Sequence, residues 1–191
     1  GTTAENVAKK FDISRKEQQD FAISSHSKAN SARETNMFDN EIVPITNNDQ
    51  IINKDGGIRP NTSHEILDGL KLAFDENGTV TAGTASPLTD GASAVIVCEE
   101  EYAKKNNLNI LARIKSTAVV GCPPELMGLG PINASKKALK RANLSISDID
   151  IVELNEAFAS QSLACIKELN MDISKVNIHG GAIALGHPLG A

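Results

Sequence analysis

Short apolar runs alternate with helix-forming segments through the second half of the sequence, and this alternation limits the possible folds more than any other feature. We predict strands at residues 94–98, 110–120, 149–154 and 176–178. We predict helices between them at residues 99–106, 131–142 and 156–169. Such an order is typical of layered α/β proteins, in which helices pack on a mostly parallel sheet. The sequence therefore predicts an α/β architecture from residue 94 onward.

Residues 1–90 have a more irregular pattern, which predicts a separate helical and loop-rich region. Ser14 and Glu17 have the spacing of a capping box, which marks the start of a long helix. Pro44 has no N–H to donate within a sheet, so the apolar run around it is predicted to be an edge strand. Here we predict helices at 3–11, 14–36 and 63–70, an edge strand at 41–45 and a loop at 46–57.

The composition argues against several kinds of partner. A net charge of −5 disfavours binding to nucleic acid or to an anionic membrane surface. No apolar run is long enough to span a membrane. The three cysteines, Cys98, Cys122 and Cys165, form no CxxC pair, and scattered thiols favour a reducing compartment over a disulfide framework. We therefore expect a soluble, cytoplasmic protein.

The most informative polar residues follow two of the predicted strands. Asn155 lies where a strand runs into a helix, and His187 lies in a glycine-rich loop just before Pro188. Ligands of α/β proteins gather at the carboxyl ends of strands, so these side chains can share one site. An imidazole and an amide aimed at one point can hold the oxygen of a thioester as it gains negative charge.

Simpler readings of the same residues stay open at this point. A histidine beside glycine and proline can be an ordinary loop residue, and an asparagine at a helix start can be only an N-cap. The glycine loop lacks the Lys-Ser/Thr of a P-loop and the GxGxxG spacing. His179 and His187 have no third ligand nearby, so we predict no metal site.

Five stretches, taken in order, resemble signature segments of the thiolase family. They are residues 3–8 with 14–18, 81–86 with 90–92, 127–131, 154–159 and 177–191. The fourth reads Leu-Asn-Glu-Ala-Phe-Ala and the fifth contains Gly-His-Pro. The resemblance covers nearly the whole chain. It implies part of the layered α-β-α-β-α thiolase fold together with the helical and loop-rich loop domain.

The resemblance also implies a domain division and a fragment. Residues 1–89 correspond to the remainder of the loop domain, residues 90–110 to the closing segment of the N-terminal thiolase domain, and residues 111–191 to most of a truncated C-terminal thiolase domain. The implied fragment lacks the N-terminal part and the extreme C-terminus of the family. The full-length protein is expected to be a homodimer or homotetramer.

Thiolases interconvert a 3-ketoacyl-CoA plus CoA with acyl-CoA plus acetyl-CoA through a cysteine nucleophile, with a second cysteine as acid/base. By resemblance, His187 takes the thiol proton of the nucleophile and lines an oxyanion hole, and Asn155 holds a water that completes the hole. A thiolate is the reactive form of cysteine, and a nearby imidazole generates it at neutral pH. Both family cysteines are expected outside this chain, so we predict that the chain alone is inactive.

Coenzyme A and acyl-CoA are implied as substrates, with no permanently bound cofactor. Ser86 matches the serine that approaches the pantetheine arm. Arg59 matches a position near the CoA phosphates, where a planar guanidinium suits phosphate oxygens. The positions that match the lining of the pantetheine and acyl pocket are Phe74, Met127, Ala157 and Phe158.

Two other readings stay open. One is a non-catalytic, thiolase-like acyl-CoA or lipid-binding protein that has lost its nucleophile. The other is a ketoacyl synthase, which shares the fold but has different signatures. The sequence also departs from the thiolase pattern at Lys71 and Ala73, where the family often has Leu-Arg followed by proline, and at His179, where an asparagine is common.

Overall fold

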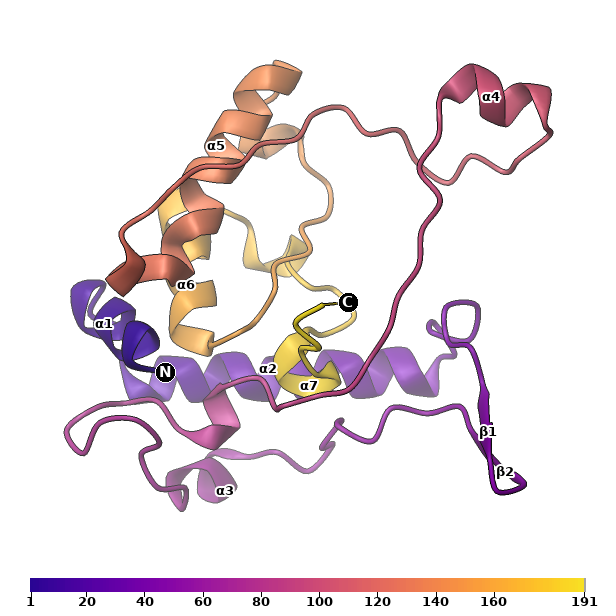
Figure 1. The fold of residues 1–191 in the computed structure, drawn as a ribbon. Coiled ribbons are helices and arrows are strands. Elements are labelled where there is room, and N and C mark those ends of the chain that lie inside the picture. The colour runs from indigo at the N-terminus through magenta and orange to yellow at the C-terminus, as the bar shows by residue number, and fades with distance from the viewer. Residues whose placement is uncertain (191) are drawn as a thin grey trace.

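A long helix packs against elements from both halves of the chain. The computed structural model describes residues 1–190, and in it α2 (Arg15–Glu34) runs across the lower half of the molecule (Figure 1). Helices α6 (Ala159–Leu169) and α7 (Ala182–Leu185) pack against α2, and α1 (Thr2–Lys10) packs against α6. The remaining helical elements are α3 (His64–Asp68), η1 (Ala82–Thr84), α4 (Glu100–Lys105), η2 (Pro124–Leu129), α5 (Gly130–Ala142), η3 (Ile146–Asp148) and η4 (Ile173–Lys175).

The start of α2 is fixed by the predicted capping box. The Ser14 backbone N–H and hydroxyl donate to one carboxylate oxygen of Glu17 at 2.7 and 2.6 Å, and the Glu17 N–H donates back to the Ser14 hydroxyl at 3.2 Å. Backbone donors that the helix itself cannot satisfy are thereby paired. The predicted helices of this half are confirmed, with ends that move by a few residues.

Replacement of Ser14 by Ala is expected to lower the free energy of unfolding by about 1 kcal/mol, because an N-cap hydroxyl is lost from the longest helix. Urea denaturation followed by far-UV circular dichroism measures the change. Ser31→Ala is the matched control, since Ser31 is exposed on the same helix and its own hydroxyl makes no hydrogen bond within residues 1–190. Equal losses in the two variants would show that the cap contributes nothing.

The main core lies between α2, α6 and the segments that lead into and out of α6. Phe21 of α2 packs with Leu154, Ile166, Val176 and Ile183 in one buried cluster. These residues come from parts of the chain that are far apart in sequence. Their burial holds the segment at Leu154 and α7 against α2, which sets the geometry of the site described below.

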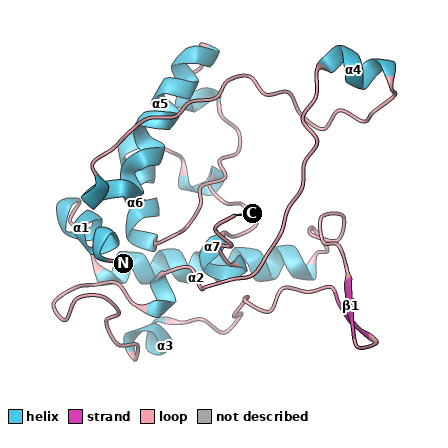
Figure 2. Ribbon diagram, viewed as in Figure 1, coloured by secondary structure: helices cyan, strands magenta, loops and turns pink. Residues whose placement is uncertain are grey.

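The only paired strands among residues 1–190 form a small hairpin, which projects from the body (Figure 2). Strand β1 (Ile45–Asn47) pairs antiparallel with β2 (Gln50–Ile52). The predicted edge strand at 41–45 and loop at 46–57 are therefore wrong. Asn48 and Asp49 both have positive φ, at 48° and 64°, which is the geometry of a two-residue hairpin turn. That turn sets the register, in which Asn47 pairs with Gln50 and Ile45 with Ile52.

The predicted strands at 94–98 and 110–120 are extended but unpaired. Figure 1 shows them as a long excursion with α4 at its tip. Val95 and Leu111 are 86% and 90% exposed, and Cys98, expected in a buried strand, is exposed as well. A strand needs a neighbouring strand to pair its N–H and C=O groups, and residues 1–190 supply none here. The strand assignment is therefore wrong for this chain alone.

The strands predicted at 149–154 and 176–178 form only a single parallel bridge. Val152 pairs with Val176: the Val152 N–H donates to the Lys175 carbonyl, and the Asn177 N–H donates to the Val152 carbonyl, both at 2.9 Å. The helix predicted from residue 156 begins only at Ala159. Asn155 thus lies ahead of the helix and does not cap it, so the expectation of an amide at a helix start is wrong.

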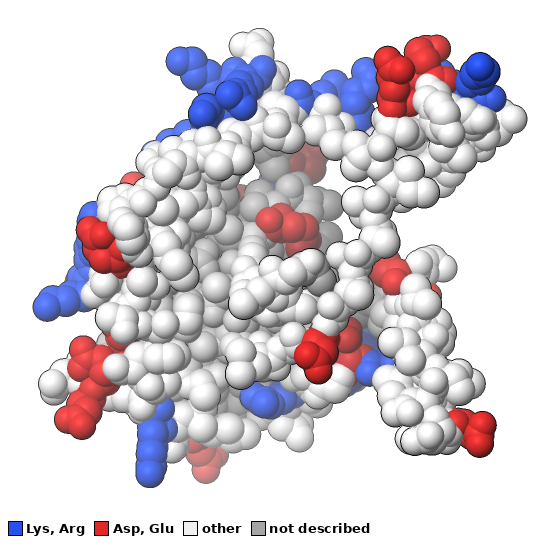
Figure 3. All heavy atoms as spheres, viewed as in Figure 1, with Lys and Arg blue, Asp and Glu red and all other residues white. Residues whose placement is uncertain are grey.

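The surface carries its charges mainly at the edges of the face shown in Figure 3, where the middle is mostly uncharged. Basic side chains gather along α5, with Lys136, Lys137, Lys140 and Arg141. Two of them are engaged with backbone, since Lys137 and Arg141 donate to carbonyls of the 117–119 segment. Within the described residues, every helix is too short or too polar to cross a lipid bilayer.

Candidate active site

Asn155 and His187 meet although thirty-one residues separate them in the sequence. The Asn155 amide nitrogen lies 3.2 Å from Nε2 of the His187 ring. Asn155 is exposed and His187 is half-buried, so the pair faces outward. The amide donates to an unprotonated Nε2. When Nε2 carries a proton both groups are donors, and a third group, such as a carbonyl oxygen, becomes their shared acceptor. The two residues are brought together, and their catalytic role stays a prediction.

The loop that carries His187 is fixed by contacts with Thr89. Helix α7 ends at Leu185, and Gly186 then adopts a φ of +102°. A Cβ on Gly186 would lie 2.5 Å from the Thr89 side chain, so only glycine fits there. The His187 N–H donates to the Thr89 hydroxyl at 3.2 Å. The sequence reasoning missed Thr89, whose one signal was its place between the 81–86 and 90–92 signature stretches.

Ser86, Ala157, Phe158 and Phe74 form a second group next to Asn155. The Ser86 N–H and hydroxyl both donate to the Ala157 carbonyl, at 3.0 and 3.2 Å. The Phe158 and Phe74 rings meet edge to face with centroids 5.9 Å apart. Phe74 is about half exposed, so the pair forms an accessible apolar surface. The predicted pantetheine positions thus adjoin the Asn155 segment.

Two predicted contact residues lie apart from this group. The Arg59 side chain is exposed, and its backbone N–H donates to Nδ1 of His26 at 3.1 Å. The preceding Ile58 packs with Ala184 of α7, which places Arg59 beside the helix that leads to His187. Met127 lies on η2, which packs against α1 and α6, and its side chain is 60% exposed. No hydrogen bond within residues 1–190 joins either residue to the aromatic pair.

The buried cysteine, Cys165, has a thiol of low reactivity. Cys165 of α6 is fully buried, and burial raises the pKa of its thiol to about 11, partly offset by a contact from the Gln161 amide. Because the thiolate is the reactive form, such a thiol is a poor nucleophile at neutral pH. The burial of Cys165 supports its exclusion as a nucleophile, and the exclusion of Cys98 and Cys122 stays a prediction.

Alkylation with iodoacetamide at pH 8 is expected to modify Cys165 at least about 100-fold more slowly than the exposed Cys98, because the Cys165 thiol is buried and largely protonated. Mass spectrometry of peptides taken over time measures both rates. The same reaction in urea is the control, and the two rates should then converge. Equal rates in the native chain would contradict the buried position of Cys165.

Comparison with known proteins identifies the family. The model for "Thiolase, N-terminal domain" matches residues 1–101, and that for "Thiolase, C-terminal domain" matches residues 108–191. The chain therefore belongs to the thiolase family. The 3-ketoacyl-CoA thiolase of Aliivibrio fischeri is 53% identical over 199 aligned residues, which cover 100% of this chain and 51% of that protein. The chain spans about half the length of the curated relatives it matches.

Solved structures agree with this assignment. Human mitochondrial 3-ketoacyl-CoA thiolase in complex with CoA has a TM-score of 0.96 and 48% identity, over 98% of this chain and 48% of that one. The dimeric peroxisomal thiolase of Saccharomyces cerevisiae also gives 0.96 at 48% identity, over 100% of this chain and 49% of that one. The predicted fold class is confirmed. The extended segments keep the thiolase path although they lack partner strands within residues 1–190.

Proposed function

We propose that this chain supplies His187 and Asn155 to a thiolase that interconverts a 3-ketoacyl-CoA plus CoA with acyl-CoA plus acetyl-CoA. The observation that carries the proposal is the 3.2 Å approach of the Asn155 amide to Nε2 of His187. The names of the relatives support the reaction, since the A. fischeri and human proteins are 3-ketoacyl-CoA thiolases. The nucleophilic cysteine is to come from the part of a thiolase that this chain does not match.

In the proposed thiolysis, His187 accepts the proton of that cysteine, and the thiolate attacks the 3-keto carbon. The bond between C2 and C3 then breaks, which leaves an acyl group on the cysteine and an enolate of acetyl-CoA that takes up a proton from the second family cysteine. Free CoA finally passes its thiol proton to that second cysteine and displaces the acyl group from the first, whose thiolate takes its proton back from His187. The N–H donors of His187 and Asn155 stabilise the thioester oxygen when it carries the enolate charge. Asn155 is proposed to act through a bound water or directly.

CoA recognition is proposed to use the surface around Ser86. The Ser86 hydroxyl donates to the Ala157 carbonyl and keeps its lone pairs for an amide of the pantetheine arm. The exposed Phe74 ring and the half-buried Phe158 ring offer an apolar wall, with Ala157 beside them, and Met127 is assigned to the acyl side. The exposed Arg59 guanidinium is proposed to pair with a CoA phosphate.

The completed protein is proposed to be a cytoplasmic homodimer or homotetramer with domain divisions near residues 89 and 110. The yeast structure is described as a dimeric thiolase, which supports the oligomer. Three free thiols support a reducing compartment.

A chimera tests the function. This chain replaces the matching residues of the A. fischeri 3-ketoacyl-CoA thiolase, and we call the product the completed thiolase. We expect it to cleave acetoacetyl-CoA with CoA within about ten-fold of the parent rate, a barrier difference of about 1.4 kcal/mol. The 191-residue chain alone and the A. fischeri remainder alone are the controls and should be inactive. A folded completed thiolase that binds CoA without cleavage would show that this chain does not supply the proposed chemistry of His187 and Asn155.

A further inference from the structure

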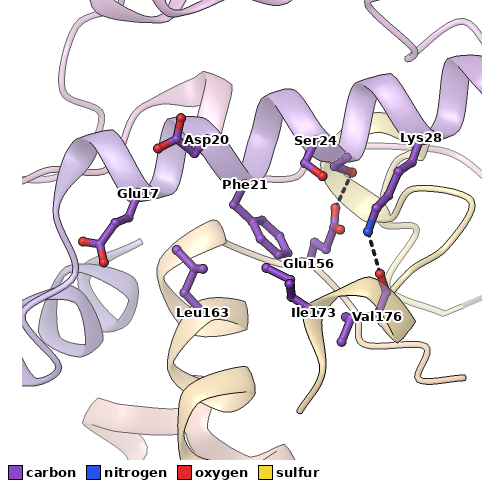
Figure 4. Close-up of a pocket in the computed structure, with 10 residues that line it drawn as sticks. Glu17, Asp20, Phe21, Ser24, Lys28, Glu156, Leu163, Ile173 and Val176 are labelled. Atoms are coloured by element: carbon purple, nitrogen blue, oxygen red, sulfur yellow. Dashed lines mark hydrogen bonds between the residues drawn. The ribbon is translucent and has the colours of Figure 1, made fainter. Parts of the chain in front are cut away.

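A buried carboxylate lies directly beside the candidate site and has no part in the mechanism above. Glu156 follows Asn155 in the sequence and is 1% exposed. One of its oxygens accepts from the Ser25 hydroxyl at 2.7 Å and from the Ile183 N–H at 3.1 Å, and the other accepts from the Asn177 amide at 2.8 Å. Glu156 lies at the wall of a cavity of about 220 Å³ between α2 and α6, and Figure 4 shows its side chain pointing toward α2.

The Ser25 hydroxyl extends this network to the start of α7. It accepts from the Gly181 N–H at 3.0 Å while it donates to Glu156. The Gly181 and Ile183 N–H groups are thus both tied, one through Ser25 and one directly, to the same carboxylate oxygen. A Cβ on Gly181 would lie 2.3 Å from the carboxyl carbon of Glu156, so the loop packs against the carboxylate. Helix α7 then leads through Gly186 to His187.

Asn177 fixes the chain on the other side of Asn155. Its side-chain oxygen accepts from the Leu154 N–H at 2.7 Å, and its amide donates to the Leu154 carbonyl and to Glu156, both at 2.8 Å. Asn155 therefore sits between Leu154 and Glu156, two residues that are held by the same asparagine. One buried network fixes both the Asn155 backbone and the helix that precedes His187.

We propose that Glu156 is a positioning residue that holds Asn155 and His187 at hydrogen-bonding distance, an inference that rests on the proposed function of that pair. All three partners of the carboxylate donate to it. A glutamine of the same shape would turn its own NH₂ group toward at least one of these donors, since the Asn177 amide is oriented by Leu154 and the Ile183 N–H is fixed in the backbone. Two acceptor oxygens are needed here, and shape alone does not suffice.

A second buried glutamate provides a matched control. Glu5 of α1 is 9% exposed and accepts from the Thr79 and Val80 N–H groups at 2.9 to 3.1 Å. It anchors the turn before η1 and makes no hydrogen bond with the site within residues 1–190. Glu5→Gln therefore removes equivalent bonds from a buried carboxylate without touching the Glu156 network. A purely structural role for Glu156 predicts the same outcome for both variants.

The test is the imidazole NMR spectrum of the full chain with ¹⁵N-labelled histidine, with the His187 signals assigned by their loss in His187→Ala. Asn155→Ala reports the spectrum of His187 without its partner. We expect Glu156→Gln to move the His187 signals most of the way to the chemical shifts that they have in Asn155→Ala. Glu5→Gln should leave the His187 signals unchanged. Far-UV circular dichroism verifies folding, and Ser25→Ala, which removes one bridging hydroxyl, replaces Glu156→Gln if that variant does not fold.

The outcomes separate the two proposals. Unmoved His187 signals in a folded Glu156→Gln or Ser25→Ala variant, or equal movement in Glu5→Gln, would overturn the role of Glu156 and leave the proposed function intact. Unmoved signals in Asn155→Ala would remove the Asn155–His187 pair itself, and both proposals with it. In the completed thiolase, Glu156→Gln is expected to lower kcat about 30-fold or more with KM for acetoacetyl-CoA changed less than about three-fold, since positioning affects the transition state more than substrate binding.

Discussion

Replacement of His187 by Ala in the completed thiolase is expected to reduce kcat for the cleavage of acetoacetyl-CoA by about 10³-fold to 10⁴-fold. Activation of a nucleophile by a general base contributes about 10²-fold to 10⁴-fold, and His187 is proposed to donate to the oxyanion as well. At about 1.4 kcal/mol per tenfold change, the transition state loses about 4 to 5.5 kcal/mol. KM should change little, because the imidazole contacts the reacting atoms and not the pantetheine arm. Steady-state thiolysis measures both constants.

His179 is the control for this variant because it lies in the same glycine-rich segment. Its ring packs edge to face on Phe38 with centroids 6.1 Å apart and makes no hydrogen bond to Asn155. His179→Asn introduces the residue that is common at this position in the family, so kcat should stay within about three-fold. A His187→Ala enzyme that kept a tenth of its activity would show that another group activates the nucleophile.

The local helical signals and the site motifs were readable from the sequence because each depends on residues close together. The Ser14–Glu17 capping box is complete within four residues, and the structure forms it as predicted. The Gly-His-Pro and Asn-Glu-Ala-Phe stretches can likewise be recognised from consecutive residues alone. The Asn155 amide nitrogen lies 3.2 Å from Nε2 of His187, and this proximity could be expected only from the predicted α/β order. The two residues do lie together, although the predicted strands did not form as a paired sheet.

The strands predicted at 94–98 and 110–120 did not form, for a physical reason that no local sequence pattern can reveal. Apolar runs such as Val95–Val97 indicate that a segment is suited to β-strand pairing, but such pairing also needs a second strand. The exposure of these side chains matches a chain that spans about half of its relatives. We expect the partner strands in the part of a thiolase that the chain does not match, and unpaired apolar edges of this kind favour association.

The Glu156 network was equally hidden from the sequence. A glutamate after an asparagine gives no sign that it is buried, and its partners Ser25 and Asn177 lie on other segments. Only the folded chain shows that Ser25, in the middle of α2, accepts a hydrogen bond from the Gly181 N–H at the start of the helix that leads to His187. Long-range polar contacts of this kind were the part of the site that motif reasoning could not supply.

Replacement of Asn155 by Ala in the completed thiolase is expected to lower kcat by about 10²-fold to 10³-fold, or about 2.7 to 4 kcal/mol, which is the usual loss when one oxyanion donor is removed. Loss of this donor affects the enolate more than the bound substrate, so KM for acetoacetyl-CoA should change less than about three-fold. Asn155→Asp should be at least as damaging, since a carboxylate places negative charge beside the developing oxyanion and offers no N–H to it. The loss in Asn155→Ala should be smaller than in His187→Ala, because only one of the two proposed roles is removed.

Asn133→Ala is the control for the Asn155 variants, because Asn133 is exposed on α5 and its side chain makes no hydrogen bond within residues 1–190. Its kcat should match that of the completed thiolase. The double variant Asn155→Ala with His187→Ala should lose much less than the product of the two single losses, since both donors act on one oxygen. Fully multiplicative losses would mean that the two side chains act independently, and the shared oxyanion hole would then be wrong even though both residues were catalytic.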